Sequence, residues 1–262
     1  MSRLIQPPDQ QAVDEFGGYG SRKSQLASEE NNAETAKNQE LGQLPEPENL
    51  ERRRACRNDL RLYVLTYFAS SCDKGLSPYQ EEIIAAFETV IVHGGKKARA
   101  VRRSGLKSTL ARIATSWAIM YGHRRFPLLI GATEESSANN REQFMQMLVE
   151  AELHNRDFPE LIPLLLKNEK PKKGVMVRGV LQRATAKNDR GYIVFPRLAG
   201  ADSDHGGDMS GALIAPYSMN TTGIRGLSFG KPGGGSNRPD LLIFDDVQTD
   251  QSAQSALMTD KI

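Results

Sequence analysis

Short apolar runs alternate with segments of helical periodicity through the middle of this chain. Phe126–Ala132 is almost entirely apolar, and Leu241–Phe244 is a second such run, a pattern typical of strands buried on both faces of a parallel sheet. Apolar residues recur at helical spacing in three longer segments, over residues 81–93, 107–121 and 136–153. This alternation predicts an α/β fold with a mostly parallel central sheet flanked by helices.

Other parts of the chain give additional elements. Glu51–Ser70 has helical periodicity, and the helix that follows is expected to be capped by Ser77 with Pro78 at its first position. Short strands are expected over residues 175–177, 192–195 and 212–216, with a further candidate between 179 and 186. A helix is expected to begin near Asp250.

The first fifty residues differ from the rest in composition. They are rich in polar residues, Gly and Pro, and carry nine acidic and four basic side chains, a net charge of −5. Such a segment buries too little apolar surface to offset the entropy of ordering, so residues 1–48 are predicted to be a largely disordered tail. Residues 49–262 are then expected to form a single domain.

Charge, cysteines and hydropathy narrow the class of protein. The whole chain has a net charge of +2, so residues 51–262 carry +7, which fits a nucleic-acid partner as well as many ordinary proteins. Cys56 and Cys72 lack metal-site spacing and are expected to be reduced thiols in a cytoplasmic protein. No apolar run approaches the roughly eighteen residues needed to cross a bilayer, so no membrane association is expected.

The segment before the second predicted helix has the properties of a phosphate-binding loop. In such loops, backbone N–H groups and a helix N-terminus surround a polyphosphate, Lys contacts the β- and γ-phosphates, and the next hydroxyl residue binds Mg²⁺. Lys107 and either Ser108 or Thr109 have these positions, although Leu106 stands where the usual pattern has Gly. The alternative is a basic strand-to-helix turn in solvent. Candidate phosphate contacts are Arg102, Ser104, Gly105, Leu106, Lys107, Ser108 and Thr109.

Two adjacent carboxylates follow the second buried strand. Asp245 would bind Mg²⁺, and Asp246 would act on an attacking water. A phosphate loop and a strand that ends in two carboxylates together predict a nucleotide hydrolase.

Three further groups each have a functional and a structural interpretation. Gln80 could pair with an adenine and Tyr79 could stack on it, or both could simply begin a surface helix. The arginines between residues 52 and 57 could contact DNA, but a solvated helix face is the favoured interpretation. The acidic group Asp202, Asp204, His205 and Asp208 could bind a metal, but a polar loop is favoured.

The order of these motifs resembles a known family. It comprises Gln80, the loop Arg-Arg-Ser-Gly-Leu-Lys-Ser-Thr, a helix with Trp117 that ends in Tyr-Gly-His-Arg-Arg-Phe, the strand Leu-Leu-Ile-Gly-Ala-Thr, then Gly-Ile-Arg-Gly and Arg-Pro-Asp-Leu-Leu-Ile-Phe-Asp-Asp. Residues 50–262 resemble the N-terminal ATPase domain of the large terminase subunit of tailed bacteriophages. The resemblance implies a P-loop NTPase of the ASCE type that packages double-stranded DNA into a procapsid.

The resemblance also implies roles, cofactors and partners. Lys107 would hold the phosphates of ATP, Ser108 and Asp245 would bind Mg²⁺, and Asp246 would replace the Glu that activates water. Arg225 resembles the arginine finger that one subunit contributes to its neighbour, with Arg102 or Arg103 as the alternative within the same chain. Implied partners are DNA, a portal protein, a small terminase subunit and further copies in a ring, in the cytoplasm of an infected bacterium.

Two features separate this chain from a complete terminase. The family's second, nuclease domain is not expected here, and the ATPase sheet is expected to be incomplete at its C-terminal end. A helicase-like ATPase of the same superfamily therefore remains an alternative. A remnant that binds nucleotide or DNA without catalysis is another.

Overall fold

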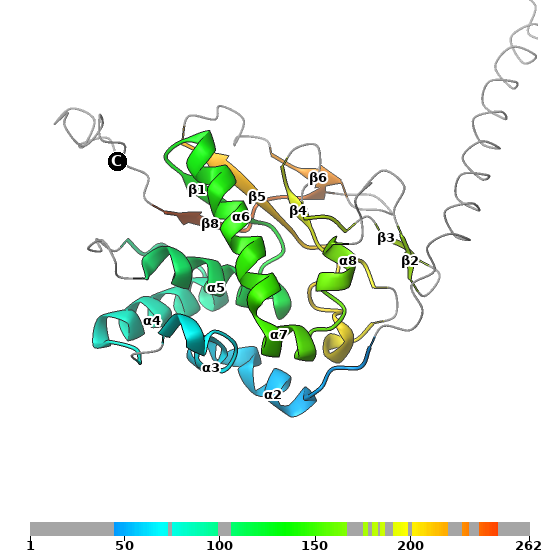
Figure 1. Cartoon of the computed structure of the whole chain (residues 1–262). Coiled ribbons are helices and arrows are strands. Elements are labelled where there is room, and N and C mark those ends of the chain that lie inside the picture. The colour runs from blue at the N-terminus through cyan, green and yellow to red at the C-terminus, as the bar shows by residue number, and fades with distance from the viewer. Residues whose placement is uncertain are drawn as a thin grey trace, which may run out of the picture.

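A four-stranded sheet in the order β4–β5–β1–β8 organises the fold of the computed structural model (Figure 1). The structure describes residues 45–72, 75–98, 106–166, 175–177, 180–182, 184–186, 191–198, 201–219, 227–230 and 236–245. Its α-helices are α2 (Leu50–Ala55), α3 (Leu60–Tyr67), α4 (Pro78–His93), α5 (Lys107–Met120), α6 (Glu134–Glu150), α7 (Glu152–Asp157) and α8 (Ile162–Leu166). Its strands are β1 (Pro127–Gly131), β2 (Val175–Val177), β3 (Val180–Gln182), β4 (Ile193–Val194), β5 (Leu213–Ser218), β6 (Phe229–Gly230), β7 (Ser236–Asn237) and β8 (Leu241–Phe244). Three short 3-10 helices are η1 (Cys56–Asn58), η2 (Ala69–Cys72) and η3 (Ser203–His205).

The sheet is mostly parallel, as predicted. Strand β1 is buried along its whole length and lies between β5 and β8, both parallel to it. Only β4, which pairs with β5, runs antiparallel in this sheet. The pairs β2–β3 and β6–β7 are separate antiparallel ribbons. The α/β class expected from the apolar runs is therefore confirmed.

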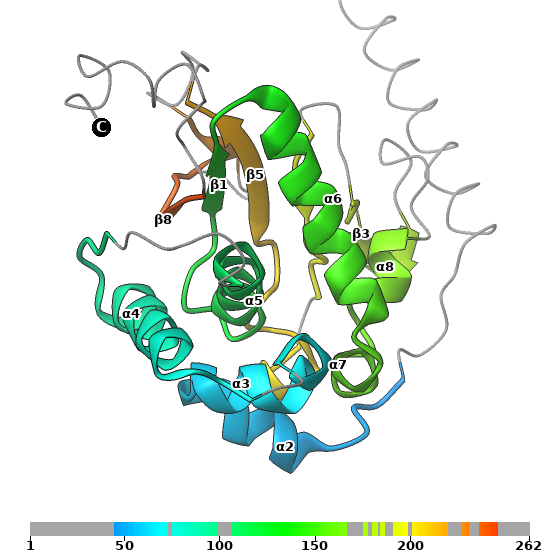
Figure 2. The same cartoon turned by 60° about the vertical axis from the view of Figure 1, so that its left-hand side comes forward.

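The two faces of the sheet bury different clusters of side chains. Leu129, Ile214 and Ile243 face the larger core, where α3, α4, α5 and α6 pack (Figure 2). Leu128 and Ile130 face the other side, in a smaller cluster with Tyr192 and Phe229. Because successive residues of a strand point to opposite faces, one short apolar strand contributes to both clusters.

Side-chain caps fix the beginnings of α4 and α6. Ser77 and Gln80 form a reciprocal capping box at α4, with Pro78 in the first turn, as the sequence predicts. Thr133 and Ser136 form the same arrangement at α6. The helix expected over 136–153 therefore begins slightly earlier, and it ends at Glu150, after which Ala151 leads into α7.

The helical pattern over Glu51–Ser70 is divided between two α-helices in the structure. The segment contains α2 and α3, because Asp59 has an extended backbone and its side chain accepts a hydrogen bond from the N–H of Leu62 at 2.7 Å. An N-cap of this kind begins a new helix within a periodic apolar pattern. After this break, α2 packs against α7 and against the 3-10 helix η3.

The structure describes only part of the segment between α4 and α5. Residues 94–98 form neither helix nor strand, and residues 99–105 lie outside the described ranges. The expected helix after Asp250 and most of the predicted N-terminal tail also lie outside them. Glu46 and Glu48 are described and contact the folded domain, through His205 and the backbone carbonyl of Arg156 respectively.

Two further expectations concern cysteines and membranes. Cys56 and Cys72 are buried, and neither forms a disulfide bond in the described part of the chain. None of the helices in the described ranges is long and apolar enough to cross a bilayer.

Candidate nucleotide-binding site

Helix α5 begins at a residue in an unusual backbone conformation. Leu106, its N-cap, has φ 58° and ψ 14° and is the only non-glycine residue with positive φ in the described ranges. A left-handed conformation is disfavoured for L-residues with a Cβ and natural for glycine. The structure thus places a glycine-type conformation at the position where the phosphate-loop pattern has glycine.

The first turn of α5 lacks the caps found on α4 and α6. The N-cap residue, Leu106, makes no side-chain cap, and no acidic residue lies in the first turn, which instead carries Lys107. The N–H groups of a first turn have no partners within the helix, and the helix dipole favours an anion there. Ser108 and Thr109 lie in the same turn and are partly buried.

The conformation of Leu106 leads to a stability prediction. The Leu106 side chain packs against the main core, so both Leu106→Ala and Leu106→Gly lose that contact. Only glycine also relieves the left-handed strain, so Leu106→Gly should be more stable than Leu106→Ala by about 1 kcal/mol. Urea unfolding of the two variants measures this difference. Greater stability of the alanine variant would contradict the left-handed assignment.

Asp245 lies at the carboxyl end of β8, beside the central strand. Its N–H donates to the carbonyl of Ile130 at 2.9 Å, which continues the parallel pairing of β8 with β1. Strand β8 and helix α5 share the main core, through Leu241 and Ile243 on the strand. The carboxyl ends of parallel strands are where ligands bind in open α/β sheets.

An arginine that the sequence does not single out connects α5 with Asp245. Arg112 donates to Thr109 Oγ1 at 3.5 Å and to Asn140 Oδ1, on α6, at 3.3 Å. Burial lowers the pKa of the Arg112 guanidinium, and the nearby negative charge of Asp245 opposes that change. Arg112, one turn into α5, is therefore close enough to Asp245 to be affected by its charge.

The proposed adenine contacts have structural partners of their own. Gln80 Oε1 accepts from the Ser77 N–H at 2.8 Å as part of the capping box. Tyr79 packs against the main core, and its buried hydroxyl has no hydrogen-bond partner in the described part of the chain. Gln80 thus belongs to the capping box of α4, and Tyr79 packs against the core. Contact of either side chain with a base stays a prediction.

Six of the predicted site residues lie outside the described ranges. They are Arg102, Arg103, Ser104, Gly105, Arg225 and Asp246. Their roles stay predictions, as does the choice between the candidate arginine fingers.

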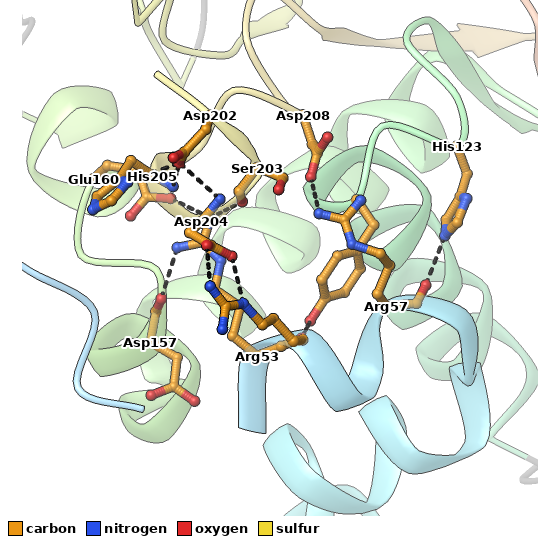
Figure 3. A network of polar contacts seen from close by, with 12 residues as sticks. Arg53, Arg57, His123, Asp157, Glu160, Asp202, Ser203, Asp204, His205 and Asp208 are labelled. Carbon is orange, nitrogen blue, oxygen red and sulfur yellow. Dashed lines mark hydrogen bonds and ion pairs between the residues drawn. The ribbon is translucent and has the colours of Figure 1, made fainter. Parts of the chain in front are cut away.

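The basic segment and the acidic loop, two candidates considered separately in the sequence, pair with each other (Figure 3). Arg54 binds both carboxylate oxygens of Asp204, and Arg57 binds Asp208. The pairing joins α2 and η1 to the loop around η3. Arginines and aspartates that bind each other have a structural role in the domain, which agrees with the interpretation of the acidic group as a polar loop.

Arg53 forms the buried part of the same network. Its guanidinium donates to Glu160 at 2.8 Å and to the backbone carbonyl of Asp157 at 2.9 Å, and lies 4.1 Å from the centre of the Phe158 ring. Its side chain is 2% exposed, and that of Glu160 is 4% exposed. Within the described ranges, no group of three His, Cys, Asp or Glu residues is arranged to hold a metal ion.

No family model, curated protein or solved structure matches this chain in comparisons with known proteins.

Proposed function

We propose that this chain is a P-loop NTPase domain that binds Mg-ATP at the N-terminus of α5. The observation that carries the proposal is the left-handed backbone of Leu106 directly before Lys107, at a helix start whose N-cap residue provides no side-chain cap. Asp245 follows a parallel strand whose buried residues share the main core with the same helix, and it would supply the carboxylate that the site requires. A loop on a solvated face would need neither feature.

The chemistry of the site follows from these positions. The first-turn N–H groups and Lys107 would bind the β- and γ-phosphates, while the Ser108 hydroxyl and the Asp245 carboxylate would hold Mg²⁺. Asp246 would orient a water and accept its proton. Because Asp is one methylene shorter than Glu, we expect slower hydrolysis than in a site with Glu at this position.

Within this class, we propose the ATPase motor of a bacteriophage terminase large subunit. Support comes from the motif order that resembles the family and from the net charge of +7 on residues 51–262, which suits a sequence-independent grip on the DNA backbone. Double-stranded DNA, a portal protein, a small terminase subunit and further copies of the chain would be its partners, in the cytoplasm of an infected bacterium. A helicase-like ATPase and a non-catalytic remnant are the alternatives.

Mg-ATP hydrolysis, measured with and without double-stranded DNA, tests this proposal. We expect turnover that DNA stimulates, and its loss in both Lys107→Ala and Asp246→Asn, because one removes the phosphate contact and the other the base. Lys97→Ala, at an exposed lysine outside the predicted site, should keep full activity. Nucleotide binding without turnover would favour the non-catalytic alternative, and equal activity of all variants would contradict the site.

A further inference from the structure

A second cavity lies between the beginning of α6 and the end of β5. Its volume is about 420 Å³, and its walls include Ala138 and Arg141 from α6 and Tyr217 from β5. Tyr192, just before β4, and Leu227 complete the wall. None of its lining residues belongs to α5 or β8, so it is separate from the proposed nucleotide site. Helix α6 packs along β5 and β1, which fixes this wall in place (Figure 2).

The cavity contains a buried arginine with few partners. Arg141 is 6% exposed, and its Nη2 donates to Glu142 Oε1 at 3.1 Å. The Glu142 side chain is 69% exposed, so water competes for this bond. No other hydrogen bond or ion pair joins Arg141 within the described ranges. A buried guanidinium has five N–H donors, and leaving them without acceptors is unfavourable.

A glycine leaves room beside the arginine. Gly191 lines the cavity with φ +77°, and a Cβ at this position would lie 3.3 Å from Arg141 Nη1. Any side chain here would therefore crowd the guanidinium as well as strain the backbone. Gly191 and the Arg141 guanidinium are thus neighbours among the residues that line the cavity.

Other residues that line the cavity are aromatic and apolar. The hydroxyls of Tyr192 and Tyr217 are hydrogen-bonded to each other at 2.8 Å, which holds both rings in position. Tyr192 also packs beside Phe229, with ring centres 6.5 Å apart. Leu227 extends this surface. A cavity with one buried positive charge and an apolar wall favours a ligand that has both an acidic group and an apolar group.

The charge of the lining favours a ligand with a single negative charge. Arg141 is the only cationic residue among the described residues that line the cavity, and the lining residue Glu134 is exposed. A phosphate, with nearly two charges, would meet one guanidinium and a repelling carboxylate. A carboxylate matches the planar guanidinium with two parallel hydrogen bonds. We propose that this cavity binds a small organic carboxylate, whose acid group pairs with Arg141 and whose apolar group lies against Tyr192, Tyr217 and Leu227.

Titration with phenylacetate, followed by NMR chemical shifts of the whole chain, tests the proposal. We expect saturable binding at millimolar concentrations or below, and at least tenfold weaker binding of the neutral analogue phenylacetamide. Phenyl phosphate should bind no more tightly than phenylacetate. Arg141→Gln should weaken phenylacetate binding at least tenfold. Arg156→Gln, which changes an arginine that is 58% exposed on α7, should leave binding unchanged.

A second variant covers the case in which Arg141→Gln does not fold. Ala138→Leu adds apolar volume at the cavity wall and retains the arginine, so it should block the probe while the melting temperature changes little. Absence of saturable binding to the unmodified chain would overturn the proposal, as would equal binding of the acid and the amide. Tighter binding of phenyl phosphate would overturn the assignment to carboxylates, and full binding by Ala138→Leu would place the ligand elsewhere.

Discussion

Arg53→Ala is expected to destabilise the domain by about 3–5 kcal/mol, because it leaves the buried Glu160 carboxylate without its partner. The variant also loses the hydrogen bond to the Asp157 carbonyl and the contact with the Phe158 ring. Burial already raises the pKa of Glu160, an effect that Arg53 opposes. Without Arg53 the carboxyl group should therefore take up a proton more readily. Urea unfolding at neutral pH measures the loss.

Arg54→Ala is the matched control for this prediction. Arg54 is the next residue of α2 and also pairs with an acidic side chain, but it is 58% exposed, so its loss should have little effect. The double variant Arg53→Met with Glu160→Leu removes both buried charges and should recover much of the stability. Equal losses for Arg53→Ala and Arg54→Ala would contradict the role of burial in this argument.

His154 is expected to make the domain sensitive to acid. The ring is fully buried and stacks on Phe158, with ring centres 4.5 Å apart, and Tyr63 and Tyr67 pack against its edges. This burial lowers the pKa of His154 to about 3. The unfolded chain, with an ordinary histidine pKa near 6.5, therefore binds a proton first as the pH falls.

The sign and range of this effect follow from linkage. The contribution of neutral His154 to the free energy of unfolding is complete above a pH of about 6.5 and should be lost as the pH falls towards about 3. The loss amounts to at most about 1.4 kcal/mol per pH unit. Urea unfolding at several pH values between about 4 and about 7, within the range bounded by the two pKa values, measures this loss of stability. His154→Phe keeps an aromatic ring and should show a shallower dependence on pH. Parallel curves for the two proteins would contradict a neutral, buried His154.

Strand β1 could be predicted from the sequence because its burial on both faces leaves a continuous apolar run. The expectation that Leu241–Phe244 is buried in the same way is wrong. Within the described sheet β8 pairs with β1 alone, and Leu242 and Phe244 are exposed. Ser77 and Pro78 likewise begin α4 with local signals. Asp59 gives the same kind of signal, but it lies within a periodic apolar segment, where the longer pattern conceals the cap.

Contacts between distant residues could not be predicted in this way. Arg54 and Asp204 have no sequence pattern that relates them, so the sequence favours a solvated helix face and a polar loop, with DNA contact and metal binding as alternatives, and does not predict their pairing. The sequence gives no reason to single out Arg112, because a lone arginine on a helix is common and its proximity to Asp245 depends on the fold. Leucine disfavours the left-handed backbone conformation that Leu106 adopts. Its local propensity therefore could not predict this conformation, and only its position in the loop motif points to it.

Binding of a fluorescent ATP analogue with Mg²⁺, measured for the unmodified chain, Lys107→Ala and Lys97→Ala, tests the nucleotide site most directly. The account predicts saturable binding by the unmodified chain and by Lys97→Ala, and binding at least tenfold weaker by Lys107→Ala, since one charged contact with phosphate is lost. Absence of binding to the unmodified chain, or equal affinity for all three proteins, would contradict a phosphate site at the N-terminus of α5.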